Sequence, residues 1–250
     1  MTKALLLAAA VIVFARGEVQ AGLDLTWGAC PADGGTANVN VSCESGRDYD
    51  LVGTFQVPTP HDCFVSMDLV LDFQVENSST VSPFWHFEAA GCNRGGISLS
   101  SDPRELQNGC SAPSPWDTTV IPQYAYGIFP GPNTSRLLFY ILNLYQTRSA
   151  LTPGQTYYAF HIRFHTINAV EAGGNCAGCR DKVAILWKTA QLVADIPPLD
   201  PSRCREGKVT VLDGPGLVGN CATWNGASVT TCGGTPVKNR TWGMLKALYR

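Results

Sequence analysis

The stretch FVSMDLVLDFQVE, residues 64–76, alternates apolar and polar side chains along almost its whole length. The apolar positions of one set are Val65, Met67, Leu69, Leu71, Phe73 and Val75. The positions between them are Ser66, Asp68, Asp72, Gln74 and Glu76, with Val70 as the one apolar exception. This alternation places one set on each face of a β-strand, whereas a helix would scatter both sets around its circumference. The stretch therefore predicts a strand with one buried and one solvated face.

Other candidate strands follow at intervals and are separated by clusters of Pro, Gly and Asn. They are residues 51–57, 84–88, 96–100, 136–145, 157–167, 183–193 and 208–212. The run RLLFYILNLY, residues 136–145, is apolar on both faces, which predicts a central strand covered on both sides or else a buried helix. Its Ile, Phe and Tyr content favours the strand. Many short strands, 25 glycines and 16 prolines predict an all-β fold of the sandwich or jelly-roll type.

The segment LTPGQTYYAFHIRF, residues 151–164, contains the pattern L-x-P-G-x-x-Y. It resembles the entry to the sixth strand of fibronectin type III and related immunoglobulin-like sandwiches. The resemblance implies a corner in which the Tyr157 hydroxyl is bonded back to the backbone, and it implies no activity. With this corner, the strands at 157–167 and 183–193 are expected to form the last hairpin of a sheet. The loop GGNCAGCRD, residues 173–181, would then connect them.

The first residues are typical of an export signal. Lys3 precedes the apolar run ALLLAAAVIVF, residues 4–14, and small side chains at Val19 and Ala21 fit a cleavage site after Ala21. The run is about half the length that a membrane-spanning helix needs. We therefore expect residues 1–21 to be a signal peptide, and the mature chain to have no membrane span and to be secreted or held at the cell surface.

The mature chain is expected to be one domain over residues 22–232, followed by a distinct segment at 233–250. Removing residues 1–21 moves the formal net charge from −2 to −3. A charge so close to zero gives no electrostatic footprint for nucleic acid. A chain of this length can bury a substantial core without cross-links.

All the cysteines lie in the mature part: Cys30, Cys43, Cys63, Cys92, Cys110, Cys176, Cys179, Cys204, Cys221 and Cys232. An even number in an exported chain predicts a set of disulfides. Spacing does not give the pairing. The sequence neighbours Cys92 with Cys110 and Cys221 with Cys232 are the simplest choice.

The pair Cys176 and Cys179 has three alternatives to cross-linking. Haem attachment needs His directly after the second cysteine, where Arg180 stands. A redox pair needs a helix N-terminus, and this pair lies between two predicted strands. A structural zinc site needs four ligands, and the sequence has no second C-x-x-C. We expect disulfides, and neither metal nor cofactor.

His161 and His165, with Arg163 between them, would lie about 13 Å apart on a strand, too far to share an ion. They are expected on the solvated face. Asp68 and Asp72 have the same separation, so together they are no glycosidase pair. A polysaccharide hydrolase stays open as the alternative function, with Asp68, Asp72 or Glu88 paired to a carboxylate of another strand.

The segment at 111–132 presents aromatic side chains on a chain rich in Pro and Gly. The candidates for ligand binding are Trp116, Tyr124, Tyr126 and Phe129. Such rings stack on sugars or anchor a protein partner. The other interpretation is that they fold inward over one end of the core.

The ending TWGMLKALYR, residues 241–250, is similar to tails on uncharacterised exported bacterial proteins, as is NCATWNG at 220–226. Residues 233–250 carry four cationic residues and no acidic one, and Thr241 can cap a short helix. The tail either docks on the sandwich or serves as an export or assembly handle. The sequence as a whole favours a non-enzymatic binding or structural protein, whose ligand is carbohydrate or another surface protein.

Overall fold

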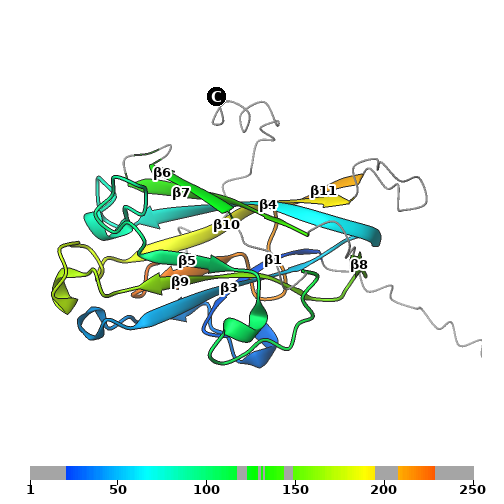
Figure 1. Cartoon of the computed structure of the whole chain (residues 1–250), viewed down its shortest axis with the longest axis horizontal. Helices are drawn as coiled ribbons and strands as arrows, with labels where there is room; N and C mark the ends of the chain where they lie inside the picture. Colours follow the sequence, from blue (N-terminus) through cyan, green and yellow to red (C-terminus); the bar gives the residue numbers. More distant parts are fainter. Residues whose placement is uncertain are drawn as a thin grey trace, which may run out of the picture.

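A computed structural model describes residues 21–116, 123–128, 131, 133–143, 149–194 and 208–228. Outside these residues lie 1–20 of the expected signal peptide, Phe129, Cys204, Cys232 and the C-terminal segment 233–250. The described chain is a β-sandwich, with two sheets stacked face to face (Figure 1). The all-β fold predicted from the sequence is confirmed.

The first sheet is four-stranded and has the order β1-β3-β9-β5. Its strands are β1 (Gly22–Trp27), β3 (Asp48–Gln56), β9 (Tyr157–His165) and β5 (Ile97–Ser100). The described helical turns have three residues each and are η1 (Pro31–Asp33), η2 (Cys43–Ser45), η3 (Pro83–Trp85), η4 (Pro103–Glu105) and η5 (Val170–Ala172).

The second sheet is eight-stranded and has the order β2-β12-β10-β4-β7-β6, with β11 paired to β10 and β8 paired to β4. Its strands are β2 (Asn38–Val39), β4 (His61–Val75), β6 (Gln123–Ile128), β7 (Thr134–Leu142), β8 (Ser149–Leu151), β10 (Val183–Ala194), β11 (Lys208–Leu212) and β12 (Cys221–Trp224). The predicted strand β4 lies between β10 and β7 and pairs antiparallel with both. Its apolar face is buried from Met67 to Val75, and its polar face is only partly covered.

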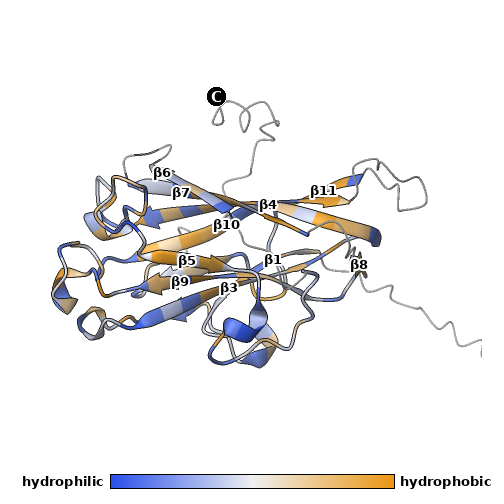
Figure 2. Cartoon of the chain, viewed as in Figure 1, coloured by the Kyte–Doolittle hydropathy of each residue, from blue (hydrophilic) through white to orange (hydrophobic). Residues whose placement is uncertain are grey.

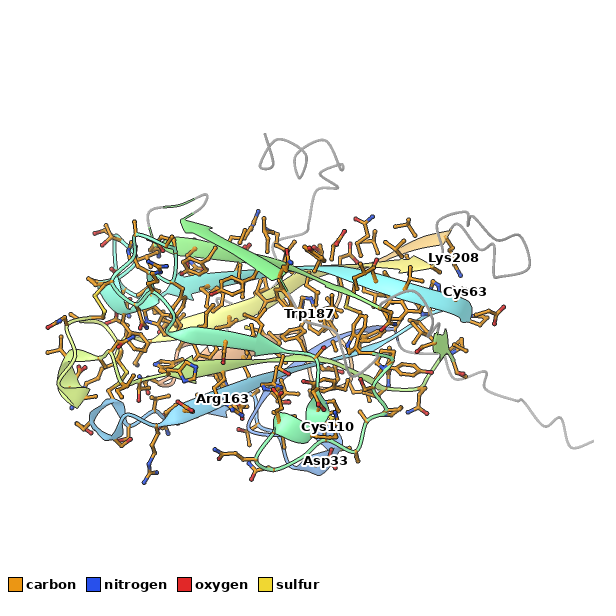
Figure 3. All side chains as sticks on the ribbon, viewed as in Figure 1. Asp33, Cys63, Cys110, Arg163, Trp187 and Lys208 are labelled. Carbon is orange, nitrogen blue, oxygen red and sulfur yellow. A yellow bond between two sulfur atoms is a disulfide. The ribbon has the colours of Figure 1, made fainter. Side chains whose placement is uncertain are left out.

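The inner faces of the sheets meet in an aromatic core. Phe164 of β9 contacts Trp27 of β1, Trp224 of β12 and Trp85 of η3, with ring centroids 5.6–5.9 Å apart. Figure 2 shows hydrophobic residues along the strands of both sheets, and Figure 3 shows Trp187 between them. Rings of this size bury more apolar surface than any other side chains, so this contact dominates the packing of the two sheets.

The corner before β9 has the predicted hydrogen bond. The backbone N–H of Thr152 donates to the hydroxyl of Tyr157 over 2.7 Å. Tyr157 then starts β9, and its ring packs against Phe55. The local pattern therefore folds as the resemblance implied.

The expected hairpin of the strands at 157–167 and 183–193 is wrong. β9 belongs to the four-stranded sheet and β10 to the eight-stranded sheet, so the loop GGNCAGCRD crosses between the sheets. Both strands are rich in apolar residues, and the sequence does not show whether they pair with each other or face each other.

Two further strand predictions need correction. Residues 83–85 form η3, because Phe84 and Trp85 both turn into the core, which a strand would not permit. Residues 136–142 of the run at 136–145 lie in β7 with only one face buried, and Tyr140 and Leu142 on the other face are 37% and 45% exposed. It is a strand, as predicted, but it is not covered on both sides.

The disulfides join segments that are distant in sequence. They link Cys30 with Cys110, Cys43 with Cys179 and Cys92 with Cys176. Cys63 and Cys221 are disulfide-bonded as well. Pairing of Cys92 with Cys110 is therefore wrong, because each is nearer in space to a partner at least 80 positions away in sequence. Cys176 and Cys179 cross-link to different segments, as expected of structural cysteines.

Replacing Cys43 and Cys179 by Ala together is expected to lower the free energy of unfolding by about 2–5 kcal/mol, because the unfolded chain is no longer closed across 136 positions. Denaturant unfolding of the oxidised protein measures the change. An unchanged midpoint would show that this cross-link does not stabilise the fold.

Tyr157→Phe is expected to cost about 1 kcal/mol, because the N–H of Thr152 loses its acceptor in a partly buried hydrogen bond. Tyr140→Phe is the matched control, since that hydroxyl donates to Gln123 at the surface and its loss should change stability by less than about 0.5 kcal/mol. Equal effects of the two substitutions in thermal unfolding would contradict the role given to the corner.

Candidate functional site

The aromatic residues singled out from the sequence do not all lie at the surface. Trp116 is 8% exposed, its indole N–H donates to the carbonyl of Ala159, and its ring packs on Phe64 at 5.0 Å. The hydroxyl of Tyr126 is hydrogen-bonded to the carbonyl of Trp85 and to Ser135. Burial raises the pKa of Tyr126 well above its ordinary value. These contacts account for both residues as parts of the core.

Among the described members of that group, Tyr124 is the exposed one. It lies on β6, an edge strand of the eight-stranded sheet, and is 41% exposed. Its register partner is the buried Phe139, so the ring of Tyr124 is on the inner side of the sheet, at the edge of the core. With Trp116 and Tyr126 in the core, the described members of the group form no continuous stacking surface.

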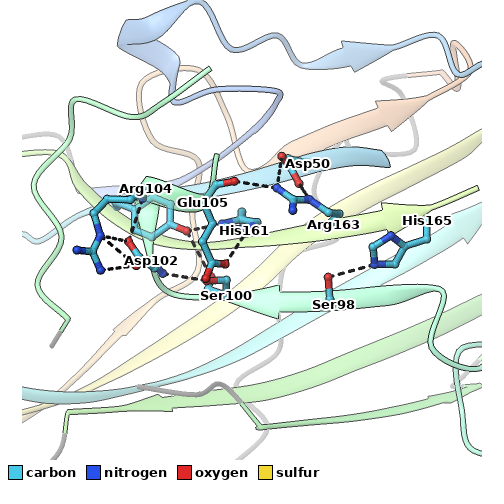
Figure 4. Close-up of polar contacts among 10 residues, drawn as sticks. Asp50, Ser98, Ser100, Asp102, Arg104, Glu105, His161, Arg163 and His165 are labelled. Carbon is cyan, nitrogen blue, oxygen red and sulfur yellow. Dashed lines mark hydrogen bonds and ion pairs between the residues drawn. The ribbon is translucent and has the colours of Figure 1, made fainter. Parts of the chain in front are cut away.

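The expectation that both histidines lie on a solvated face is wrong for His161, which is only 2% exposed. The segment that contains η4 covers the outer face of β9 at this point, and Nε2 of His161 lies 4.0 Å from Glu105 (Figure 4). Its Nδ1 lies 2.8 Å from the hydroxyl of Tyr158. Burial lowers the pKa of His161. His165 is half-buried and pairs with Asp48 at 2.8 Å, so each histidine has its own carboxylate neighbour.

The charged groups beside His161 are paired with one another. Arg163 donates two hydrogen bonds to Asp50, over 2.7 and 3.0 Å, and a third to the carbonyl of Glu105. Asp102 accepts from the backbone and the guanidinium of Arg104. The bond from Arg163 to the carbonyl of Glu105 joins η4 to the four-stranded sheet. The part of the outer side around His161 is therefore covered by the protein's own polar contacts.

Two of the three carboxylates considered for hydrolysis are held in ion pairs. Arg136 donates to both oxygens of Asp72, over 2.5 and 2.8 Å, and Lys188 lies 3.1 Å from the same carboxylate. Glu88 pairs with His86 at 2.7 Å, and its second oxygen is buried and accepts no hydrogen bond within the described chain.

Asp68 differs from both. Among the described residues nothing donates a hydrogen bond to its carboxylate or forms an ion pair with it. Burial alone raises the pKa of Asp68, because the charged form is removed from water without a compensating partner.

The outer side of the eight-stranded sheet is mostly apolar around Asp68. The strand register places Asp68 in one row with Tyr140, Gln191 and Val211. Ser66 lies in the next row with Leu142, Val193 and Val209. Val70 lies in the third row with Leu138 and Thr189. We call the following seven residues the apolar face: Val70, Leu138, Tyr140, Leu142, Val193, Val209 and Val211.

The apolar face is accessible although it lies on a folded sheet. Val209 and Val211 of β11 are 51% and 56% exposed, in addition to the exposed Tyr140 and Leu142. Figure 2 shows β11 as hydrophobic along most of its length. Exposed apolar side chains that adjoin one another on one surface are typical of an interaction site. This face is the candidate functional site.

Two irregularities in the sequence lie on this face. Val70 breaks the polar series of the strand at 64–76, and the run at 136–145 is apolar at the positions that should be solvated. Val70 and Leu138 are cross-strand neighbours on the outer side. Only the register shows that the two irregularities coincide.

The described residues offer one group with metal-binding atoms within 4.8 Å of one another, formed by Cys30, Asp33 and Cys110. The two cysteines are bonded to each other and supply no thiolate. Asp33 instead accepts from the backbone N–H of Ser111 over 2.7 Å, beside Cys110 (Figure 3). No helix in the described part of the chain is long and apolar enough to cross a membrane.

No protein-family model matches the chain, and no curated protein does. Solved structures similar to it include a cohesin module from a Clostridium perfringens ATCC13124 family 33 glycoside hydrolase, with 9% identity and a TM-score of 0.35 over 82% of this chain and 97% of that chain. Another is AvmM, described as catalysing macrocyclization in alchivemycin A biosynthesis, with 14% identity and a TM-score of 0.34 over 88% and 93%. Likeness at this level says nothing about function.

Asp68→Asn is expected to stabilise the protein at pH 7 by about 0.5 kcal/mol, the scale of a surface substitution. Burial raises the pKa of Asp68, so the ionised form weakens the fold above that pKa. The gain should vanish below pH 3.8, the ordinary pKa of Asp, where the carboxyl is protonated in both states. Thermal unfolding across pH measures it.

Asp72→Asn, on the same face of the same strand, is the matched control. It should lower stability by about 1–2 kcal/mol, because Arg136 and Lys188 lose their carboxylate. Destabilisation by both substitutions would contradict the view that Asp68 has no partner.

Proposed function

We propose that this chain is an exported, disulfide-cross-linked protein without enzymatic activity, and that its apolar face binds another protein. The observation that carries the proposal is the position of this face. The face lies on the outer side of the eight-stranded sheet, and the inner side of that sheet packs the core. The apolar face therefore takes no part in the packing of the two sheets. Exposing such side chains costs solubility, and a binding partner explains why they are there.

The chemistry of the face favours a protein over a carbohydrate. Sugars bind through rings that stack on their C–H faces, and Tyr140 is the one aromatic residue of the apolar face. The others are aliphatic, and aliphatic side chains of a partner cover such a surface well. Asp68 adds a requirement for a cationic group or a hydrogen-bond donor, since a carboxylate covered without a partner would lose its hydration. The expected ligand is a polypeptide segment with apolar side chains and a Lys or Arg.

The disulfides support export. Three of them join distant segments, and such bonds persist in oxidising compartments outside the cytoplasm. The apolar start of the sequence and its small residues at 19 and 21 fit the same route. The tail similar to those of exported bacterial proteins points to a bacterial cell surface or its surroundings.

A hydrolase receives less support from the geometry. The cross-strand neighbours of Asp68, about 5 Å away, are Tyr140 and Gln191. The next positions along β4 on the same side are Ser66 and Val70. None of these is a carboxylate, whereas glycosidases need a second one within about 5–9.5 Å.

The test places a photoreactive benzoylphenylalanine at Val211 of the full oxidised chain, with the same residue at exposed Arg94 as control. After incubation with the surface and secreted fraction of the producing cells, we expect one protein adduct from position 211 and none from 94. Leu142→Glu, on the same face, should reduce the adduct at least tenfold. Equal labelling from positions 211 and 94 would contradict the proposal. Binding of the protein to a glycan on an array, without any protein adduct, would contradict it as well.

A further inference from the structure

The geometry points to the chain's own C-terminal segment, residues 233–250, as a ligand of the apolar face. We infer that this tail covers the face in the same molecule and that a partner protein must displace it. The inference rests on the proposed function, because it takes the apolar face to be a surface that recognises polypeptide.

The described chain ends on the correct side of the sheet. Ala227 and Cys221 pack against Ala184 on the outer side of the eight-stranded sheet, with Leu186 beside them. Leu186 is the register partner of Asp72, and Asp72 belongs to the same outer side as Asp68. The polypeptide that continues beyond Ser228 therefore leaves from the side that carries the apolar face.

The distance is within reach. The backbone N–H of Ser228 donates to Glu76 over 2.6 Å, which places the last described residue at the end of β4. Asp68 lies eight residues back along that strand, about 26 Å at the usual rise. Residues 229–241 can extend over roughly 43 Å. The segment from 242 onward can therefore reach the face without strain in the connection.

The tail has the side chains that the face requires. Trp242, Leu245 and Tyr249 have the spacing i, i+3 and i+7, so they would share one side of the short helix that the sequence predicts from Thr241. The four cationic residues of the tail are Lys238, Arg240, Lys246 and Arg250, and residues 233–250 contain no acidic residue. Lys246 directly follows Leu245, so apolar and cationic groups adjoin each other.

Charge complementarity selects Asp68 as the anchor on the face. Of the two carboxylates on the outer side of β4, Asp72 already has Arg136 and Lys188 as partners. The carboxylate of Asp68 is partly buried and has no described partner, and its cross-strand neighbours are Tyr140 and Gln191, neither of which is cationic. A Lys or Arg of the tail would restore the lost interaction while the apolar side chains cover Tyr140 and Val211.

The first test uses benzoylphenylalanine in place of Tyr140 in the full oxidised chain, with Arg94 as the control position. Light should join position 140 to a peptide from residues 233–250 within the monomer, at a yield independent of protein concentration. Position 94 should give no such product. Absence of a tail peptide from the products of position 140 would overturn the inference.

The second test uses a fluorescent synthetic peptide of residues 233–250, which contains no cysteine. In the full chain with Trp242→Ala and Leu245→Ala, the face should be free, and the peptide should bind at least tenfold more tightly than to the unaltered chain. Adding Asp68→Asn should then weaken the peptide at least threefold, whereas Asp50→Asn, on the other sheet, should not. Equal affinity for the unaltered and tail-substituted chains would contradict covering in the same molecule.

The two proposals fail in different ways. If position 211 captures a partner protein, while position 140 does not cross-link to the tail and the tail peptide does not bind the face, the tail inference is wrong and the proposed function stands. If the tail binds the face and even the tail-substituted chain captures no partner, the face makes an intramolecular contact only and the proposed function is wrong.

Discussion

The packing of aromatic rings around Phe164 is the interaction on which the rest of the structure depends. Trp27, Trp85 and Trp224 reach it from β1, from η3 and from β12, three segments far apart in sequence. Contacts of this kind remove large apolar areas from water and fix the two sheets at one spacing. The sheets, the turns at their ends and the cross-links between them all take their positions from this core.

The disulfides fix the connecting segments around this core. Cys43–Cys179 and Cys92–Cys176 tie the loop that crosses between the sheets to two other segments. Cys30–Cys110 fixes the segment after η4, which lies over β9. One outer side of the sandwich is thereby covered and satisfied by ion pairs. The other side keeps its apolar residues at the surface, and the proposed binding site lies there.

The stability and the proposed function make opposite demands on Asp68. An unpaired, partly buried carboxylate weakens the free protein, whereas Asp72 on the same strand is neutralised by Arg136 and Lys188. Sites that bind other molecules commonly retain such unfavourable groups, because the ligand supplies the missing interaction. The same logic makes a cationic tail a suitable temporary cover.

Local pattern alone determined much of the fold. The alternation at 64–76 specified β4 and its buried face, the corner at Tyr157 followed from a seven-residue motif, and ten cysteines after an expected export signal indicated cross-linking. These features depend on neighbours in sequence, whose spacing fixes where each side chain points. Tertiary structure decided which cysteines pair, that β9 and β10 face each other across the core, that His161 is buried, and that Val70 meets Leu138 at the surface. Each of these depends on strand register and on contacts between residues tens of positions apart, which alternation along a single strand leaves undetermined.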